Sequence, residues 1–297
     1  MYNAQHKTNT KYWIWLSRIQ KLTTVQKAVL LKKFNTPQAI WELNYNNLIQ
    51  VPELDEKSVN EILNNEYREN LEKYEEYISK NNIKLITLFD EEYPKSLKNI
   101  YDTPIMLFAK GNTKLLENGG IAIVGSRNCT LYGSETAKKL AYNLAKKNIP
   151  IISGLARGID KYSHIGALEA QGDTIAVLGN GLDYIYPYEN KNLYERILEN
   201  NGLIVTEYVI GTQPSKINFP ARNRIISGLA DGVTVVEAQK RSGALITADF
   251  ALEQGKEVFA VPGNVNSANS EGTNELIKQG ATLVTNYQDI ISAMCHT

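Results

Sequence analysis

The pattern of apolar and polar positions changes once along the chain, near residue 80. Before that point apolar residues recur at helical spacing in YWIWLSRI, VQKAVLLKKF and PQAIWELNYNNLIQV, and no segment between them alternates with a period of two. The stretch EILNNEYRENLEKYEEYISKNN predicts a longer, charged helix that connects this region to the rest. We therefore predict a small all-α domain over residues 1–80, similar to a helix-hairpin-helix module.

After residue 80 the pattern predicts a second, α/β domain over residues 81–297. An apolar strand, a Tyr-Pro turn and another strand come first, and short β-branched runs then alternate with helical stretches. Such continuous apolar strands indicate a parallel or mixed sheet with helices on both faces. The runs that predict its strands lie at 121–125, 149–153, 174–179, 203–207, 233–238, 257–263 and 281–285.

In an open parallel sheet, ligands bind beyond the carboxyl ends of the strands. The first run ends in GSRNCTLYG, which resembles the start of a dinucleotide-binding turn, G-x-G-x-x-G. Arg127 stands where the second glycine of that fingerprint would be. Because a long cation fills the space that a pyrophosphate needs, this turn favours a phosphate of some other ligand.

A local excess of cations follows two later strands, although Lys+Arg and Asp+Glu are equal at 32 each over the whole chain. Residues 211–245 contain five cations (Lys216, Arg222, Arg224, Lys240 and Arg241) and two acids, Asp231 and Glu237. Phe219 lies among these cations, and single-stranded nucleic acid is bound by such a combination of rings and positive charge. The alternative is that Phe219 anchors the loop and the arginines pair with carboxylates. The convergence of several cations favours a polyanion site, with Glu207 and Glu237 orienting the arginines.

The sequence predicts no catalytic residues, metal or cofactor. The three histidines are His6, His164 and His296, and no Cys, His or Asp set has metal-ligand spacing. We interpret His164 as structural, bonded to Asp160 four positions earlier, and neither Ser126 nor Ser242 has the G-x-S-x-G setting of a nucleophile. No apolar run has the length of a signal peptide or membrane span, and cysteines are few, which favours a soluble protein of the reducing cytoplasm.

Read together, these segments resemble the DNA-processing protein A family, also called DprA or Smf. The resemblance covers about residues 85–290 and rests on VGSR, SGLARGIDKYSHIGAL, TIAVLGNGLDYIYPYEN, NFPARNRIISGL, VVEAQKRSGALITADFALEQGKEVFAVPG and GTNELIKQGATLV, in that order. It implies an extended Rossmann-like fold behind a small sterile-alpha-motif-like domain. Some members append a winged-helix domain, which we do not expect in this chain.

The resemblance also implies a function in natural transformation. Members bind single-stranded DNA without catalysis, protect it, help load the RecA recombinase while displacing single-strand-binding protein, and form homodimers. The predicted DNA-binding residues include the helix start after Lys240, and some members have a basic residue where Tyr188 stands here. The full set is Gly125, Ser126, Arg127, Ser153, Gly154, Lys216, Phe219, Arg222, Asn223, Arg224, Lys240, Ser242 and Gly243.

A nucleotide- or phosphoribosyl-processing enzyme that uses the same sheet-end cleft is the alternative. The segment PGNVNSANSEGTNELI resembles the PGG-x-GT loop of lysine-decarboxylase-like hydrolases, although Asn264 replaces the second glycine of its pair.

Overall fold

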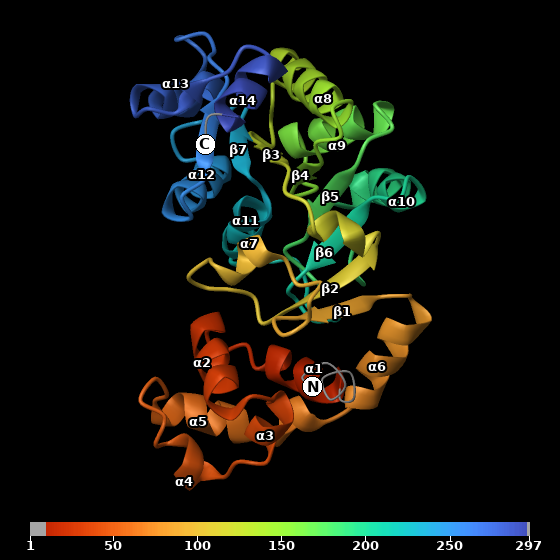
Figure 1. Ribbon diagram of the computed structural model, residues 1–297, viewed down its shortest axis with the longest axis vertical. Coiled ribbons are helices and arrows are strands. Elements are labelled where there is room, and N and C mark those ends of the chain that lie inside the picture. The colour runs from red at the N-terminus through yellow and green to blue at the C-terminus, as the bar shows by residue number, and fades with distance from the viewer. Residues whose placement is uncertain (1–9, 296–297) are drawn as a thin grey trace.

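The computed structural model describes residues 10–295, so His6 and His296 lie outside the described residues (Figure 1). No helix in this part is long and apolar enough to cross a membrane. The chain begins with a helical module, as its apolar spacing predicts. The helices of the module are α1 (Thr10–Arg18), α2 (Thr24–Phe34), α3 (Pro37–Trp41), α4 (Tyr45–Leu48), α5 (Glu56–Leu63), the 3-10 helix η2 (Asn65–Arg68) and α6 (Leu71–Lys80).

The long charged helix predicted at the end of this module is wrong, because the chain breaks it into three pieces. The side chain of Asn64 caps η2, and Asn70 adopts a left-handed conformation with φ of 56°. Asparagine tolerates that conformation better than most residues. The guanidinium of Arg18 donates to the carbonyls of Tyr67 and Glu69 at 2.9 and 2.7 Å, which holds the break in place.

Within the described residues nine strands form one sheet, in the order β1-β2-β6-β5-β4-β3-β7-β8-β9. The apolar runs after residue 120 form β3 to β9, as predicted, and these seven strands are parallel. The first two strands are antiparallel to each other, and β2 is antiparallel to β6. The bounds are β1 (Lys84–Thr87), β2 (Met106–Gly111), β3 (Ile121–Val124), β4 (Ile151–Ser153), β5 (Thr174–Val177), β6 (Leu203–Thr206), β7 (Gly232–Val235), β8 (Glu257–Ala260) and β9 (Thr282–Leu283).

Helices cover both faces of the sheet (Figure 1). One face packs against α7 (Lys95–Lys98), α11 (Asn218–Leu229), α12 (Gly243–Glu253) and α13 (Glu271–Lys278). The other face packs against α8 (Leu131–Ala145), α9 (Ile159–Glu169), α10 (Lys191–Glu199) and α14 (Tyr287–Met294). Short 3-10 helices lie at η3 (Thr113–Leu116), η4 (Tyr188–Asn190) and η5 (Ala268–Ser270). The predicted α/β architecture is confirmed.

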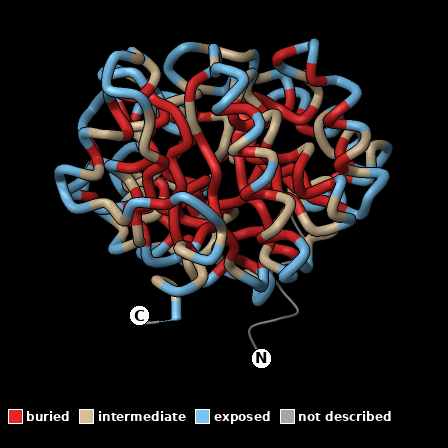
Figure 2. Tube along the Cα trace, turned by 90° about the horizontal axis from the view of Figure 1, so that it is seen from above, coloured by how far each residue is buried: buried red, intermediate tan, exposed pale blue. Residues whose placement is uncertain are grey.

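The helical module continues the apolar core of the sheet. Its buried Trp13 and Trp15 belong to one cluster with Phe108 of β2, Ile204 of β6 and Leu193 of α10. Figure 2 shows buried segments running through the middle of the molecule with exposed segments around them. The predicted boundary at residue 80 coincides with the end of α6. That the two parts fold as separate domains stays a prediction.

Candidate nucleic-acid interface

A cleft of about 480 Å³ lies at the carboxyl edge of the sheet. Its walls come from the segments that follow β3, β4, β5, β6 and β7. This is the topological switch point, because β4, β5 and β6 lie on one side of β3 while β7, β8 and β9 lie on the other. Ligands of open α/β sheets bind at such a point.

Most of the predicted site residues meet at this cleft. Gly154 borders a smaller adjoining pocket of about 60 Å³. The predicted residues that line the main cleft are Gly125, Ser126, Arg127, Lys216, Phe219, Arg222, Asn223, Ser242 and Gly243.

Packing within the protein requires a glycine at position 125. A Cβ at this position would lie 2.6 Å from Cγ1 of Ile159 in α9 and 2.9 Å from the carbonyl oxygen of Glu237. The amide of Ser126 donates to that same carbonyl at 2.7 Å. The glycine therefore lets the turn after β3 fit between α9 and the end of β7, and this fit places Arg127 at the cleft.

Three predicted residues line neither the cleft nor the adjoining pocket. Ser153 is fully buried, and its hydroxyl donates to the carbonyl of Ile123 at 2.7 Å. Lys240 is exposed, but its neighbour Arg241 contributes to the cleft wall instead. The third residue, Arg224, is buried elsewhere in the fold, so a direct ligand contact is not available to Ser153 or Arg224.

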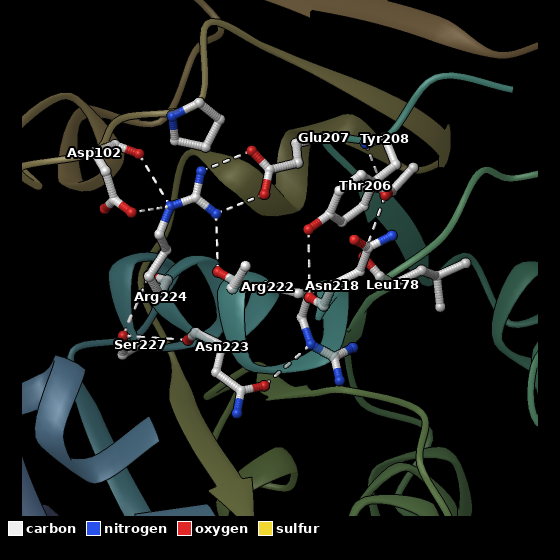
Figure 3. Close-up of polar contacts among 12 residues, drawn as sticks. Asp102, Leu178, Thr206, Glu207, Tyr208, Asn218, Arg222, Asn223, Arg224 and Ser227 are labelled. Carbon is white, nitrogen blue, oxygen red and sulfur yellow. Dashed lines mark hydrogen bonds and ion pairs between the residues drawn. The ribbon is translucent and has the colours of Figure 1, made fainter. Parts of the chain in front are cut away.

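Arg224 is a buried arginine that pairs with two partly exposed carboxylates. Its guanidinium lies 2.5 Å from a carboxylate oxygen of Glu207 and 2.7 Å from one of Asp102, and the side chain is 3% exposed. Helical residues two positions apart project in different directions, so Arg222 and Arg224 do not share a side of α11. Figure 3 shows Arg224 between the two carboxylates and Arg222 extending away from it. Glu207 thus orients an arginine, but one that does not line the cleft. For Arg224 the alternative holds, in which the arginine pairs with carboxylates.

Arg222 forms part of the floor of the cleft. It is 4% exposed, and its guanidinium donates to the carbonyls of Gly154 and Val177 and to Oδ1 of Asn223. Burial lowers the pKa of Arg222 to about 10, while the charge of Asp160 opposes that shift. Burial likewise raises the pKa of Asp160, and the charge of Arg222 opposes it. This buried pair offers less charge to a ligand than an exposed arginine does.

The exposed cations of the cleft are Arg127, Lys216 and Arg241. They come from the segments after β3, β6 and β7, so they approach the cleft from different sides. Arg241 precedes Ser242, whose hydroxyl caps α12. In the sequence, a basic residue just before this helix start indicated a cation at the cleft. The fold shows that this cation is Arg241 and not Lys240.

An aromatic pair lies among these cations. The rings of Tyr186 and Phe219 stack with centroids 5.4 Å apart and an interplanar angle of 24°. The guanidinium of Arg127 lies 5.3 Å from the centroid of Phe219. Sequence reasoning missed Tyr186, because the loop after β5 and the start of α11 come together only in the folded chain.

The remaining polar candidates have structural roles. Glu237 accepts hydrogen bonds from the amide and hydroxyl of Thr130 at 2.9 and 2.5 Å. It therefore anchors the N-cap residue of α8 and does not orient an arginine as predicted. His164 contacts the Thr174 hydroxyl at 2.7 Å, not Asp160, and burial lowers its pKa to about 3. Among residues 10–295 no group of three acidic, histidine or cysteine side chains is placed to hold a metal.

The fold and the cleft define a class of Rossmann-like α/β proteins in which exposed cations surround an aromatic pair at the switch point. A sequence model of the family described as DNA recombination-mediator protein A matches residues 84–295. The chain belongs to this family, which confirms the predicted resemblance.

Relatives and solved structures agree with this assignment. DNA processing protein DprA of Streptococcus pneumoniae is 48% identical over 206 residues, which are 69% of this chain and 72% of that protein. A crystal structure of that organism's DNA processing protein A aligns with a TM-score of 0.80 and 38% identity, over 95% of this chain and 97% of the other. DNA processing protein A from Helicobacter pylori, solved to describe its single-stranded DNA binding mode, has a TM-score of 0.64 and 35% identity over 73% and 98%.

Proposed function

We propose that the chain binds single-stranded DNA in the switch-point cleft. The observation that carries this proposal is the convergence of Arg127, Lys216 and Arg241 around the ring pair of Tyr186 and Phe219. Cations along a groove contact phosphates, and rings stack on bases of any identity. The single-stranded DNA binding of the Helicobacter pylori relative supports the same ligand class.

Affinity should depend on salt and little on sequence. If the three exposed cations each neutralise one phosphate, the slope of log K against log salt is about −2 for a single strand. Arg222 in the floor of the cleft adds little to this slope, because the negative charge of Asp160 compensates its positive charge.

Anisotropy titrations of labelled oligo-dT over a range of salt concentrations test the proposal. We expect Arg127→Ala and Lys216→Ala each to weaken binding and to make the salt slope shallower by about 0.7–1. Lys147→Ala is the control, because Lys147 is exposed just before β4, at the amino edge of the sheet opposite the cleft. Unchanged affinity in both cleft variants would falsify the assignment of this site.

We further propose that the bound strand is handed to a recombinase, as the family description suggests. In this proposal a homodimer protects incoming DNA during transformation, displaces single-strand-binding protein and helps load RecA. RecA ATP hydrolysis on oligo-dT coated with single-strand-binding protein tests this step. The wild type should shorten the lag before hydrolysis, and Arg127→Ala should not. An equal lag with and without the wild type contradicts a loading role.

The enzymatic alternative requires the segment after β8 to take part in a nucleotide-binding site. There the Asn274 side chain bonds both the amide and the carbonyl of Gly263, at 3.2 and 3.0 Å, so this loop is tied to α13. Neither residue lines the cleft. We expect no free base on incubation with nucleoside monophosphates, and release of base would favour the enzyme.

A further inference from the structure

The ring of Phe219 is already surrounded within the protein. A Cβ on Gly179 would lie 2.8 Å from its Cδ1, so the ring packs directly against that backbone. Tyr186 stacks on it, and the guanidinium of Arg127 lies over it. Phe219 is half-buried and lines both pockets, so a nucleobase in the cleft can reach only the part of its ring that these three neighbours leave uncovered.

Tyr186 presents the accessible ring of this pair. It is 45% exposed and lines both the main cleft and the smaller pocket beside it. Large aromatic side chains on an ordered surface, supported from behind and open in front, are the feature on which single-stranded nucleic acid stacks.

The loop that carries Tyr186 is held by buried amides at both ends. Asn180, 1% exposed, donates to the carbonyls of Gly181 and Tyr184 at 2.9 and 2.8 Å. Asn190, also 1% exposed, donates to the carbonyl of Leu155 at 2.9 Å. The ring is thus positioned before any ligand arrives, which reduces the entropy lost on binding.

We infer that Tyr186 is the residue on which a base of the bound strand stacks, with Phe219 as its inner support and Arg127 beside it for the adjacent phosphate. This inference rests on the proposed function and names the ligand of this subsite as a nucleobase of any identity. The stacking of a base is thereby assigned to a ring in a different loop from Phe219, the aromatic residue that the sequence singled out.

The test compares Tyr186→Ala, Tyr186→Phe and wild type on two strands of equal length, oligo-dT and an abasic phosphodiester strand. On oligo-dT, Tyr186→Ala should bind about 5- to 140-fold more weakly, which corresponds to one base–ring stack of about 1–3 kcal/mol. Tyr186→Phe keeps the ring and should stay within about twofold. Tyr101→Ala is the matched control, since Tyr101 is 90% exposed and does not line the cleft.

The abasic strand separates stacking from a merely structural role. Wild type and Tyr186→Ala should bind it equally, because it offers no base to the ring. An equal loss on both strands, or no loss on oligo-dT, overturns the inference while leaving the cleft as the DNA site. If the wild type binds neither strand, the proposed function itself fails.

The support role of Phe219 has its own readout. Because Phe219 packs against Gly179 and Tyr186, Phe219→Ala should lower the melting temperature of the DNA-free protein. Tyr186→Ala, which removes a half-exposed ring, should leave that temperature nearly unchanged. A lower melting temperature for Tyr186→Ala than for Phe219→Ala contradicts the assigned order of the two rings.

Discussion

At Arg224 the guanidinium lies between two carboxylates and is 3% exposed, whereas Arg127 is exposed and lies against an aromatic ring. Arg224 lies in α11, and Arg127 lies in the turn after β3. The two side chains have different roles, because a charge that is paired inside the fold attracts an external ligand only weakly. Arg224 holds α11 to Glu207 and Asp102, and Arg127 is free to contact a ligand.

Replacing Arg224 should affect stability, and replacing Arg127 should affect binding. Arg224→Met removes the buried cation and leaves the carboxylate of Glu207, 14% exposed, without its partner, which should lower the free energy of unfolding by about 1–3 kcal/mol. Arg127→Ala should change it by less than about 0.5 kcal/mol, since the side chain is exposed. Urea unfolding measures both values. An Arg224→Met protein that unfolds at the wild-type urea concentration would contradict a stabilising role of these ion pairs.

At the scale of elements, apolar runs predicted the strands after residue 120, because a strand buried on both faces needs continuous apolar sequence. The location of the site was also predictable, because the carboxyl ends of parallel strands meet at one edge of the sheet. The broken helix before Leu71 was not, since Arg18 fixes it from 49 and 51 positions away. The burial of Arg224 depends on Asp102, 122 positions earlier, and no local pattern contains that pairing.

Two glycines of the cleft should respond in opposite ways to alanine. Gly125→Ala places a methyl group 2.6 Å from Ile159, so overpacking should cost about 1–3 kcal/mol and displace Arg127. Gly243 has no atom within 4 Å of the added Cβ, and it begins α12, so alanine there should be neutral or stabilise by up to about 1 kcal/mol. Thermal unfolding of the two variants checks this contrast. Equal melting temperatures would show that the turn after β3 is not tightly packed.

For the whole molecule, the charge of Glu207 acts on both the helical module and the cleft helix. It pairs with Arg224 of α11, and its charge also acts on Lys27 of α2. Lys27 is buried, and its ammonium donates to the carbonyl of Ser17 at 3.2 Å. Burial lowers the pKa of Lys27 from 10.5 to about 8, although Glu207 opposes this shift.

This buried lysine predicts how stability varies with pH. Below about pH 8, Lys27 is protonated in both the folded and the unfolded protein, and burial of its charge destabilises the folded state by about 3 kcal/mol. Between about pH 8 and 10.5 the folded state releases the proton while the unfolded state keeps it, so the free energy of unfolding rises with pH. At pH 7, Lys27→Met should have a larger free energy of unfolding than the wild type. The gain should be at most about 3 kcal/mol, reduced by the loss of the hydrogen bond to Ser17. The free energy of unfolding of the variant should not increase between pH 8 and 10.5 as that of the wild type does.

Urea unfolding at pH 7 and pH 9.5 measures the difference between wild type and Lys27→Met. Lys32→Met is the control, because Lys32 is an exposed lysine on the same helix. The control should follow the wild type at both values of pH. A Lys27→Met protein with the wild-type dependence on pH would mean that Lys27 stays protonated in the folded state throughout.

The ends of the sheet determine how copies of this protein can meet. At one end β9 has only two residues, and at the other β1 lies next to the helical module (Figure 1). A short or covered edge strand gives another chain few backbone groups to pair with. Any contact between two copies would then be made by side chains rather than by pairing of strands. Pairing of sheet edges is accordingly not a route by which copies of this protein would grow into fibrils.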